Sequence, residues 1–179
     1  MSTTMKYFIT VFGGSQCGPD DAEYRDALRL GRLLAERGFT VVCGGYSGVM
    51  EAVSRGAREA GGEAIGVTLA DRQARPNEYL TRQQPAPDLF ERLRGLILQS
   101  SGFVALRGGL GTIVEVCLVW NLFLLRTLTP RPLVLLGDCW PPVVEAWRQH
   151  LPVEETHQQW IQFASVPDEA GSRLTAVMP

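Results

Sequence analysis

Three glycine-rich segments each follow a short apolar run, a pattern that favours phosphate binding. They are Gly13-Gly14-Ser15, Gly44-Gly45-Tyr46-Ser47-Gly48 and Gly108-Gly109-Leu110-Gly111-Thr112. Glycine lets the backbone approach an anion closely, and a helix that begins there presents unpaired N–H groups and the positive end of its dipole. Because ligands of open parallel sheets bind beyond the carboxyl ends of the strands, we expect one phosphate-binding crevice at these turns.

A single Gly-Gly turn is more often a tight strand-to-helix connection than a binding site, so the prediction depends on the convergence of three turns. Two better-known phosphate motifs are absent. The first turn lacks the Gly-x-Gly-x-x-Gly spacing of dinucleotide-binding proteins, and no Walker A lysine follows any glycine segment. The sequence therefore argues against ordinary dinucleotide binding and against a P-loop protein.

Glu115 is the candidate catalytic carboxylate. It follows Thr112 by three residues, which places both side chains on neighbouring surface of a predicted helix. The surrounding residues 113–119 are otherwise apolar, so a carboxylate there loses hydration and is a candidate for a functional role. The structural alternative is a capping-box partner near the start of the helix.

Strands alternate with helices along the chain and would position these residues. Strands are expected over 7–12, 39–43, 64–69, 102–106, 132–136 and 160–166. Helices are expected from residue 20 to Gly38, over 47–60 with Ser47 as N-cap, and over 89–99, 112–126 and 141–150. Residues 70–87 are expected to form a long loop.

This alternation predicts an α/β fold, a Rossmann-like doubly wound parallel sheet of about six or seven strands with helices on both faces. The expected order of the first five strands is 3-2-1-4-5. A length of 179 residues fits a single nucleotide-binding domain over 1–179.

Composition narrows the function classes. Hydrophobic residues make up 45% of the chain, and the net charge of -2 gives no electrostatic footprint for nucleic acid. No apolar stretch reaches the ~20 residues of a membrane span, and the N-terminus does not resemble a signal peptide. The four cysteines form no CxxC pair and have no histidine cluster beside them. We therefore expect a cytoplasmic protein with no metal, no cofactor, no membrane contact and no nucleic-acid partner.

The helix over 112–126 is apolar nearly all round, most clearly from Val116 to Leu125. One side of such a helix covers the sheet, so another protein surface is expected to cover the other side. We predict a homodimer formed through this helix.

These motifs resemble those of the LOG (Lonely Guy) family, phosphoribohydrolase-like proteins once labelled lysine decarboxylases. The family's Pro-Gly-Gly-x-Gly-Thr-x-x-Glu motif is similar to residues 107–115, which begin with Arg107 and end with Glu115. Residues 43–53, which include Met50, resemble its second glycine turn and the helix after it. Gly13-Gly14-Ser15 resembles its Cys-Gly-Ser, and residues 89–93 fall on its Met-x-x-Arg-Lys helix.

The resemblance implies hydrolysis of the bond between a base and ribose 5-monophosphate, with a cytokinin nucleotide or an AMP-like compound as substrate. The glycines of the three turns, with Ser15, Ser47, Met50, Arg107, Leu110 and Thr112, would bind the phosphate or nucleotide. Glu115 would stabilise the cationic sugar and orient the water, and Arg92 would complete the catalytic pair. The structural alternative for Arg92 is a surface ion pair with Asp88.

Two residues depart from the family motifs. Leu93 replaces a lysine, which is expected to remove a cation from the pocket, and Arg107 replaces a proline, which adds a cation near the turn. Pyridoxal-phosphate chemistry needs a lysine, and the chain's only lysine, Lys6, precedes the first strand at the wrong end of the sheet. The decarboxylase label is therefore rejected.

Three functions stay open at this point. The first is a nucleoside 5′-monophosphate phosphoribohydrolase. The second is a non-catalytic module that binds or carries a nucleotide or cofactor, similar to nucleotide sensors and molybdenum-cofactor carriers, which Leu93 and Arg107 favour. The third is a structural dimer with an empty crevice.

Overall fold

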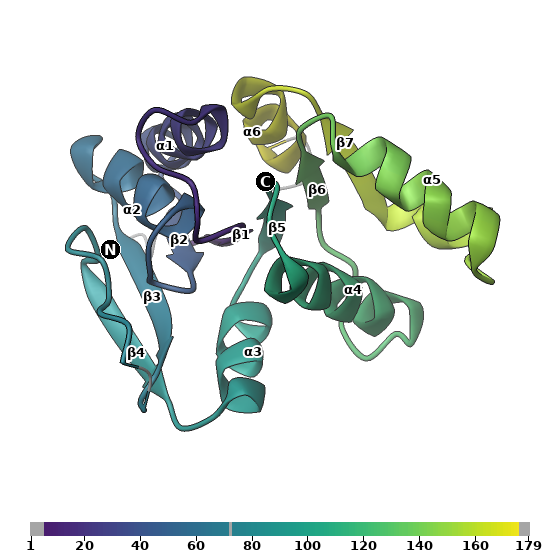
Figure 1. Ribbon diagram of the computed structural model, residues 1–179, viewed down its shortest axis with the longest axis horizontal. Coiled ribbons are helices and arrows are strands. Elements are labelled where there is room, and N and C mark those ends of the chain that lie inside the picture. Colours follow the sequence, from purple (N-terminus) through teal and green to yellow (C-terminus); the bar gives the residue numbers. More distant parts are fainter. Residues whose placement is uncertain (1–5, 72, 176–179) are drawn as a thin grey trace, which may run out of the picture.

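Parallel strands form one seven-stranded sheet in the computed structural model, which describes residues 6–71 and 73–175 (Figure 1). The order is β4-β3-β2-β1-β5-β6-β7. The strands are β1 Phe8–Phe12, β2 Thr40–Cys43, β3 Ala64–Leu69, β4 Arg82–Ala86, β5 Gly102–Ala105, β6 Leu133–Leu136 and β7 Ile161–Ala164. The predicted Rossmann-like doubly wound fold is confirmed, and the expected 3-2-1-4-5 order corresponds to β3-β2-β1-β5-β6.

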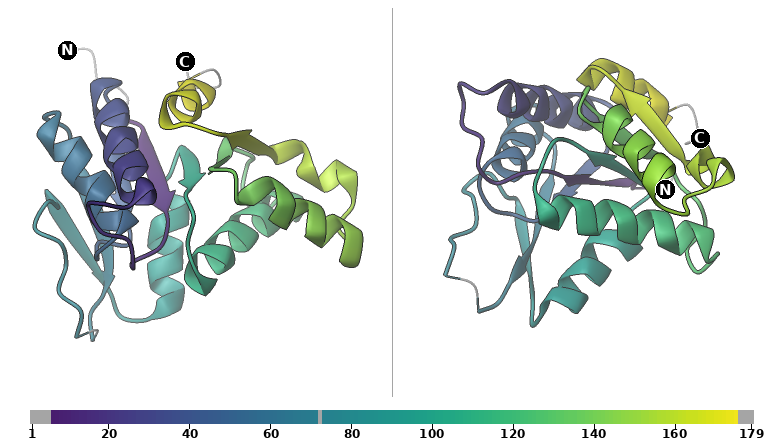
Figure 2. Two further views of the ribbon diagram at one scale, coloured as in Figure 1. Left: turned by 45° about the horizontal axis from the view of Figure 1, so that its top comes forward. Right: turned by 45° about the vertical axis from the view of Figure 1, so that its right-hand side comes forward.

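Helices cover both faces of the sheet (Figures 1 and 2). One layer contains α1 Ala22–Glu36, α2 Val49–Glu59 and α6 Pro167–Thr175, and the other contains α3 Leu89–Leu98, α4 Leu110–Leu124 and α5 Trp140–His150. A short 3-10 helix, η1 Glu155–Trp160, precedes β7. Along β1, Ile9 and Val11 belong to the core under α1 and α2, whereas Phe12 belongs to the core under α3 and α4. Strands buried on both faces are largely apolar, and the one polar residue of β1, Thr10, donates its buried hydroxyl to Leu96 O.

The strand order reverses at β1, and the point of reversal in the sheet lies between β1 and β5. Strands β2, β3 and β4 lie on one side of β1, and β5, β6 and β7 lie on the other. The last register pair of β1 and β5 is Phe12 with Ala105, so the two strands end level with each other. Ligands of doubly wound sheets bind at such a point, beyond the carboxyl ends of the strands.

The expected loop over 70–87 is wrong in its second half. Residues Arg82–Ala86 form β4, the edge strand that pairs with β3 from Ile65–Arg82 to Leu69–Ala86. Its side chains are mostly exposed and polar, and it contains Pro85, which has no N–H to donate. An edge strand of this composition has no apolar period, so the sequence pattern did not reveal it.

Two helices begin elsewhere than expected. Ser47 is not the N-cap of α2, because Gly48 holds that position with φ 69°. The first helical residue of α4 is Leu110, so α4 starts inside the glycine segment rather than at Thr112. The final helix, α6, was not predicted. Across the part of the chain that the structure describes, no helix is long and apolar enough to cross a membrane.

Gly31 sets how closely α1 and α2 pack, because a Cβ at this position would lie 2.1 Å from Val53 O on α2. We expect Gly31→Ala to force the two helices apart and to lower the free energy of unfolding by about 1–3 kcal/mol. Urea denaturation followed by circular dichroism measures this loss. Gly18→Ala is the control, since a Cβ there has no described atom within 4 Å. Equal losses in the two variants would contradict the packing argument.

Candidate functional site

The turns after β1, β2 and β5 contact one another through their backbones. The Gly14 N–H donates to Arg107 O at 3.1 Å, and the Val49 N–H donates to Gly14 O at 2.9 Å. Ser47 Oγ donates to Ser15 O at 3.0 Å, which joins the second turn to the first. The structure therefore brings the three predicted glycine segments together at the carboxyl ends of neighbouring strands.

These turns and two charged side chains, Arg92 and Glu115, enclose a cavity of about 270 Å³, here called the inner cavity. Its walls come from β1, from all three glycine segments and from helices on both sides of the switch point. The lining residues are Val11, Phe12, Gly13, Gly14, Ser15, Gly44, Tyr46, Met50, Arg92, Gly109, Gly111, Thr112 and Glu115.

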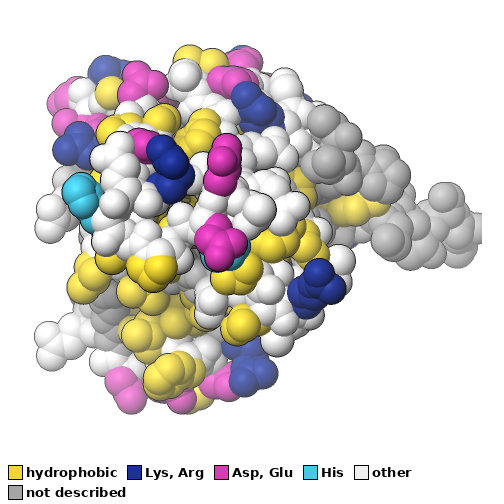
Figure 3. Space-filling model, turned by 90° about the vertical axis from the view of Figure 1, so that its right-hand side faces the viewer, with side chains coloured by type: hydrophobic (Ala, Val, Ile, Leu, Met, Phe, Trp, Pro, Cys, Tyr) yellow, Lys and Arg dark blue, Asp and Glu magenta, His cyan; other side chains and the backbone are white. Residues whose placement is uncertain are grey.

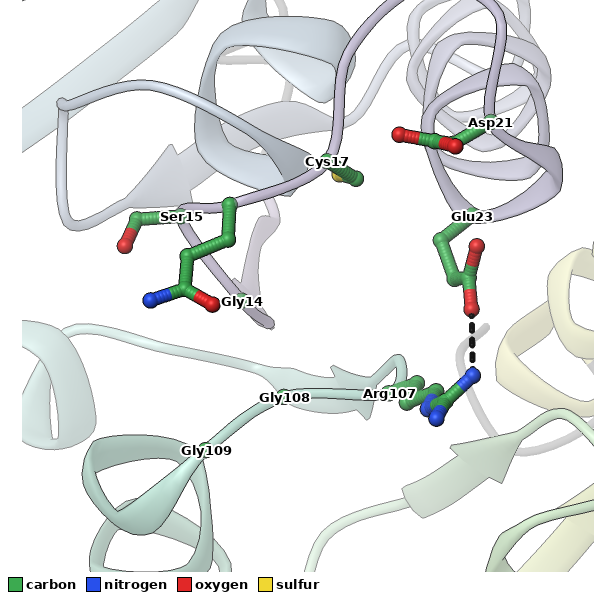
Figure 4. Close-up of a pocket in the computed structure, with 9 residues that line it drawn as sticks. Gly14, Ser15, Cys17, Asp21, Glu23, Arg107, Gly108 and Gly109 are labelled. Atoms are coloured by element: carbon green, nitrogen blue, oxygen red, sulfur yellow. Dashed lines mark hydrogen bonds and ion pairs between the residues drawn. The ribbon is translucent and has the colours of Figure 1, made fainter.

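A second cavity of about 530 Å³, here called the outer cavity, borders the inner one (Figure 4). The two share Gly14, Ser15 and Gly109. The outer cavity lies between the segment that leads into α1 and the turn after β5, and its other lining residues are Gln16, Cys17, Asp21, Glu23, Arg107 and Gly108. Gln16, Cys17 and Asp21 of the β1–α1 segment and Glu23 of α1 were not predicted, because no motif distinguishes them in the sequence.

The N-terminus of α4 opens into the inner cavity. Its N-cap is Gly109, no side chain caps it, and Gly111 and Thr112 of its first turn line the cavity. The first N–H groups of an α-helix have no partner within the helix, so they are available to an anion. The first N–H of α2 differs, since Val49 already donates to Gly14 O. Of these two turns, the one at α4 is better prepared to bind a phosphate.

Gly109 and Gly111 have free space where side chains would be. A Cβ on either residue would have no described atom within 4 Å, and neither residue has a positive φ. Neither packing nor backbone conformation therefore requires glycine at these two positions. Gly108 is different, because its Cβ would lie 2.2 Å from Thr112 Oγ1 and 2.8 Å from Gly14 N. The space beside Gly109 and Gly111 is where a ligand can reach the backbone.

Arg92 projects from α3 into the inner cavity and is only 8% exposed. Its Nε donates to Val67 O at 2.9 Å and its Nη2 to Gly44 O at 3.5 Å. A Cβ on Gly44 would lie 2.0 Å from Nη2, so this glycine provides the space for the guanidinium. The alternative of a surface pair with Asp88 is wrong, because Asp88 caps α3 by accepting the Glu91 N–H at 2.9 Å.

Glu115 faces Arg92 inside the cavity. Its Oε1 lies 3.6 Å from Arg92 Nη1, which is an ion pair but too long for a hydrogen bond. Burial raises the pKa of Glu115 from 4.5 to about 7, and the positive charge of Arg92 opposes part of that rise. The capping-box alternative is wrong, because the N-cap is Gly109 and the third helical residue is Thr112. Glu115 is a buried carboxylate that titrates near neutral pH.

The two departures from the family motifs lie outside the inner cavity. Leu93 lines a groove between α3 and α4, so the expectation that it removes a cation from the pocket is wrong. Successive residues of a helix point about 100° apart, and α3 directs Arg92 rather than Leu93 toward the crevice. Arg107 extends into the outer cavity, where its Nη1 donates to Glu23 Oε1 at 3.0 Å (Figure 4).

Some predicted binding residues do not line either cavity, and Tyr46, Val11 and Phe12 of the inner cavity were not predicted. Ser47 and Gly48 hold the first two turns together, and the nearest atoms to a Cβ on Gly45 belong to Thr68 and Gly66. Leu110 is 77% exposed and is not among the lining residues of the two cavities. Tyr46 lines the inner cavity. Its position inside the second glycine segment, directly after Gly45, was the available signal.

Known proteins share both this sequence pattern and this fold. The model of the SLOG cluster4 family matches residues 6–146. An uncharacterized protein of Archaeoglobus fulgidus is 34% identical over 62% of this chain and 71% of its own. The cytokinin riboside 5′-monophosphate phosphoribohydrolase LOG7 of Arabidopsis thaliana is 34% identical over 60% of this chain and 51% of its own.

The match spans about half the length of such plant relatives. The structure of the molybdenum cofactor carrier protein of Chlamydomonas reinhardtii superimposes with a TM-score of 0.74 at 26% identity, over 97% of this chain and 99% of that one. The glycine motifs, the fold and the family model thus agree. The chain belongs to the SLOG cluster4 family, and its predicted membership of the LOG family is confirmed.

Proposed function

We propose that this chain hydrolyses the N-glycosidic bond of a nucleoside 5′-monophosphate and releases the free base and ribose 5-phosphate. The observation that carries the proposal is the ion pair of Arg92 and Glu115, which lies about one turn from the open N-terminus of α4. A phosphate bound at that N-terminus would bring its ribose to the carboxylate. The similarity to plant phosphoribohydrolases supports the same reaction, with a cytokinin nucleotide or AMP as substrate.

The reaction builds positive charge on the ribose as the bond to the base breaks. The base leaves with the electron pair and takes up a proton, while water adds to C1′ and gives up a proton. Ionised Glu115 stabilises the cationic sugar and orients the water. Arg92 favours the ionised form of Glu115 and offers N–H donors to the ligand.

A second candidate is a protein that binds or carries a phosphorylated ligand without turnover. It is favoured by the likeness to the molybdenum cofactor carrier protein, which extends over nearly the full length of both chains. The same crevice would bind the ligand in either case. Assays of turnover and of ligand binding separate the two functions.

We further propose that residues 1–179 act as one nucleotide-binding domain in the cytoplasm. The described strands all belong to one sheet, which supports a single domain. Its four cysteines, Cys17, Cys43, Cys117 and Cys139, are unpaired, as is usual in a reducing compartment.

The position of Lys6 bears on the decarboxylase label. Lys6 pairs with Glu63 just ahead of β1, whereas the glycine turns follow the other ends of the strands. This position supports the rejection of pyridoxal-phosphate chemistry.

We also propose that a second copy of the chain covers the apolar groove between α3 and α4. This groove, of about 280 Å³, includes Leu93, Leu98, Leu118 and Leu122, and beside them Phe90 is 81% exposed. Figure 3 shows hydrophobic side chains gathered in the lower half of one face of the molecule.

The helix α4, which was predicted to form the dimer contact, lines this groove with only one of its sides. Val116, Val119 and Phe123 are buried against the sheet, whereas Leu118 and Leu122 line the groove. In a two-fold dimer the same patch meets itself, so Phe90 of each copy could fill part of the other copy's groove.

The first test is base release from AMP and a panel of other nucleoside 5′-monophosphates, followed by chromatography. We expect turnover by the unmodified chain and a loss of at least about 100-fold in Glu115→Gln, because an amide cannot stabilise the cation as a carboxylate does. Glu91→Gln, which changes an exposed carboxylate of α3, should retain activity. No release from any nucleotide, together with thermal stabilisation by one of them, would instead establish the binding function.

The second test is the dependence on pH. Because Glu115 must be ionised and its pKa is about 7, kcat/KM should rise as the pH increases through about 7.

The raised pKa of Glu115 also means that its ionisation lowers the free energy of unfolding. A contribution on the order of 3 kcal/mol is complete below pH 4.5 and is lost as the pH rises through about 7. Urea denaturation at several pH values should show this loss in the unmodified chain and not in Glu115→Gln. The same slope in both would contradict the assignment to Glu115.

The third test is the oligomeric state, measured by size-exclusion chromatography with light scattering. We expect a dimer for the unmodified chain and a monomer for Phe90→Asp, because the charge would be buried in the interface. Leu151→Asp, at an exposed leucine that does not line the groove, should remain a dimer. A monomeric unmodified chain at micromolar concentration would exclude the proposed contact.

A further inference from the structure

The Arg92–Glu115 pair is held apart rather than closed. The distance of 3.6 Å from Nη1 to Oε1 leaves no direct hydrogen bond between them, although both side chains are largely buried. Buried opposite charges attract strongly, so the surrounding atoms must restrain the guanidinium. Two restraints are the hydrogen bonds from Arg92 to Val67 O and Gly44 O.

Tyr46 provides a third restraint. The ζ carbon of Arg92 lies 5.8 Å from the centre of the Tyr46 ring, within the range of a cation–π interaction. The ring is 3% exposed and lines the inner cavity together with Arg92. Arg92 is therefore in contact with an aromatic ring as well as with two carbonyl groups.

Tyr46 is held at the hydroxyl group of its ring and at its backbone. The Leu69 N–H, at the end of β3, donates to Tyr46 Oη at 2.8 Å. At the backbone, Asn77 Nδ2 donates to Tyr46 O at 3.0 Å, and the Asn77 N–H donates to Gly45 O at 2.9 Å. These bonds tie Tyr46 to the end of β3 and to the segment between β3 and β4, so the ring can act as a rigid surface for Arg92.

We propose that Tyr46 is a positioning residue that keeps the Arg92 guanidinium from closing onto Glu115, so that Nη1 stays available to the ligand. This inference rests on the proposed function for its consequence in catalysis, but its structural part does not depend on turnover. If the ring is removed, Arg92 can swing toward Glu115 and form a direct salt bridge. Such a bridge occupies the donors that a ligand would use and strengthens the preference of Glu115 for its ionised form.

The decisive measurement is a carbon-13 NMR titration of the Glu115 carboxyl in the ligand-free chain, assigned with Glu115→Gln. We expect Tyr46→Leu to lower the titration midpoint of Glu115. The groups that face this carboxyl are Arg92 and, further away, the buried thiol of Cys43, whose pKa burial keeps above its ordinary value. Tyr46→Phe, which keeps the ring and loses the bond from Leu69, should give a smaller shift in the same direction.

Tyr79→Leu is the matched control, since Tyr79 also lies beneath an arginine, with Arg55 at 5.7 Å, but does not line the inner cavity. Its titration midpoint should equal that of the unmodified chain. If Tyr46→Leu does not fold, Tyr46→Phe carries the test. An unchanged midpoint in the folded Tyr46 variant would overturn the proposal.

In the base-release assay, we expect kcat to fall on the order of 10-fold in Tyr46→Leu and to be largely retained in Tyr46→Phe. A shifted midpoint in a chain that releases no base would support the positioning role and reject the phosphoribohydrolase function. Turnover by the unmodified chain, with unshifted midpoints in the Tyr46 variants, would support the phosphoribohydrolase function and reject the positioning role.

Discussion

The crevice depends on the direct backbone contact between the turns that follow β1 and β5. Gly14 donates to Arg107 O, and a Cβ on Gly108 would lie only 2.8 Å from Gly14 N. Side chains at these positions would separate the two strand ends. The contact places the N-terminus of α4 beside the first turn, and the other features of the site follow from that placement. Glu115 lies one helical turn further on, where α3 brings Arg92 to meet it.

The two buried charged side chains of the site, Arg92 and Glu115, have unequal sets of partners. Arg92 has two backbone carbonyl acceptors and an aromatic ring, so its charge is well accommodated. Glu115 has the guanidinium at 3.6 Å as its charged partner and, among the described residues, no comparable set of hydrogen bonds, which is why burial raises its pKa so far. A carboxylate left short of partners is ready to interact with a cationic ligand atom. The site thus combines a well-partnered cation, Arg92, with a carboxyl group, Glu115, that has few partners.

The sequence was sufficient for the fold and for the location of the crevice, because glycine turns that follow buried strands are typical of the ligand-binding edge of a parallel sheet. It was less informative wherever the answer depends on the direction of a side chain. Leu93 is adjacent to Arg92 in the chain yet points into the groove between α3 and α4. Tyr46 resembles an ordinary core residue until its ring is seen against Arg92. The edge strand β4 was missed because its polar side chains lack the pattern of a buried strand.

The composition of that edge strand has a consequence for how copies of the chain can associate. Arg82 and Gln83 are exposed, and Pro85 interrupts the outward row of N–H groups. A strand from another molecule would find few donors and a charged side chain along this border, so the sheet resists extension and amyloid-like stacking there. Association through helical surfaces then faces little competition from this border of the sheet, even when the protein is concentrated.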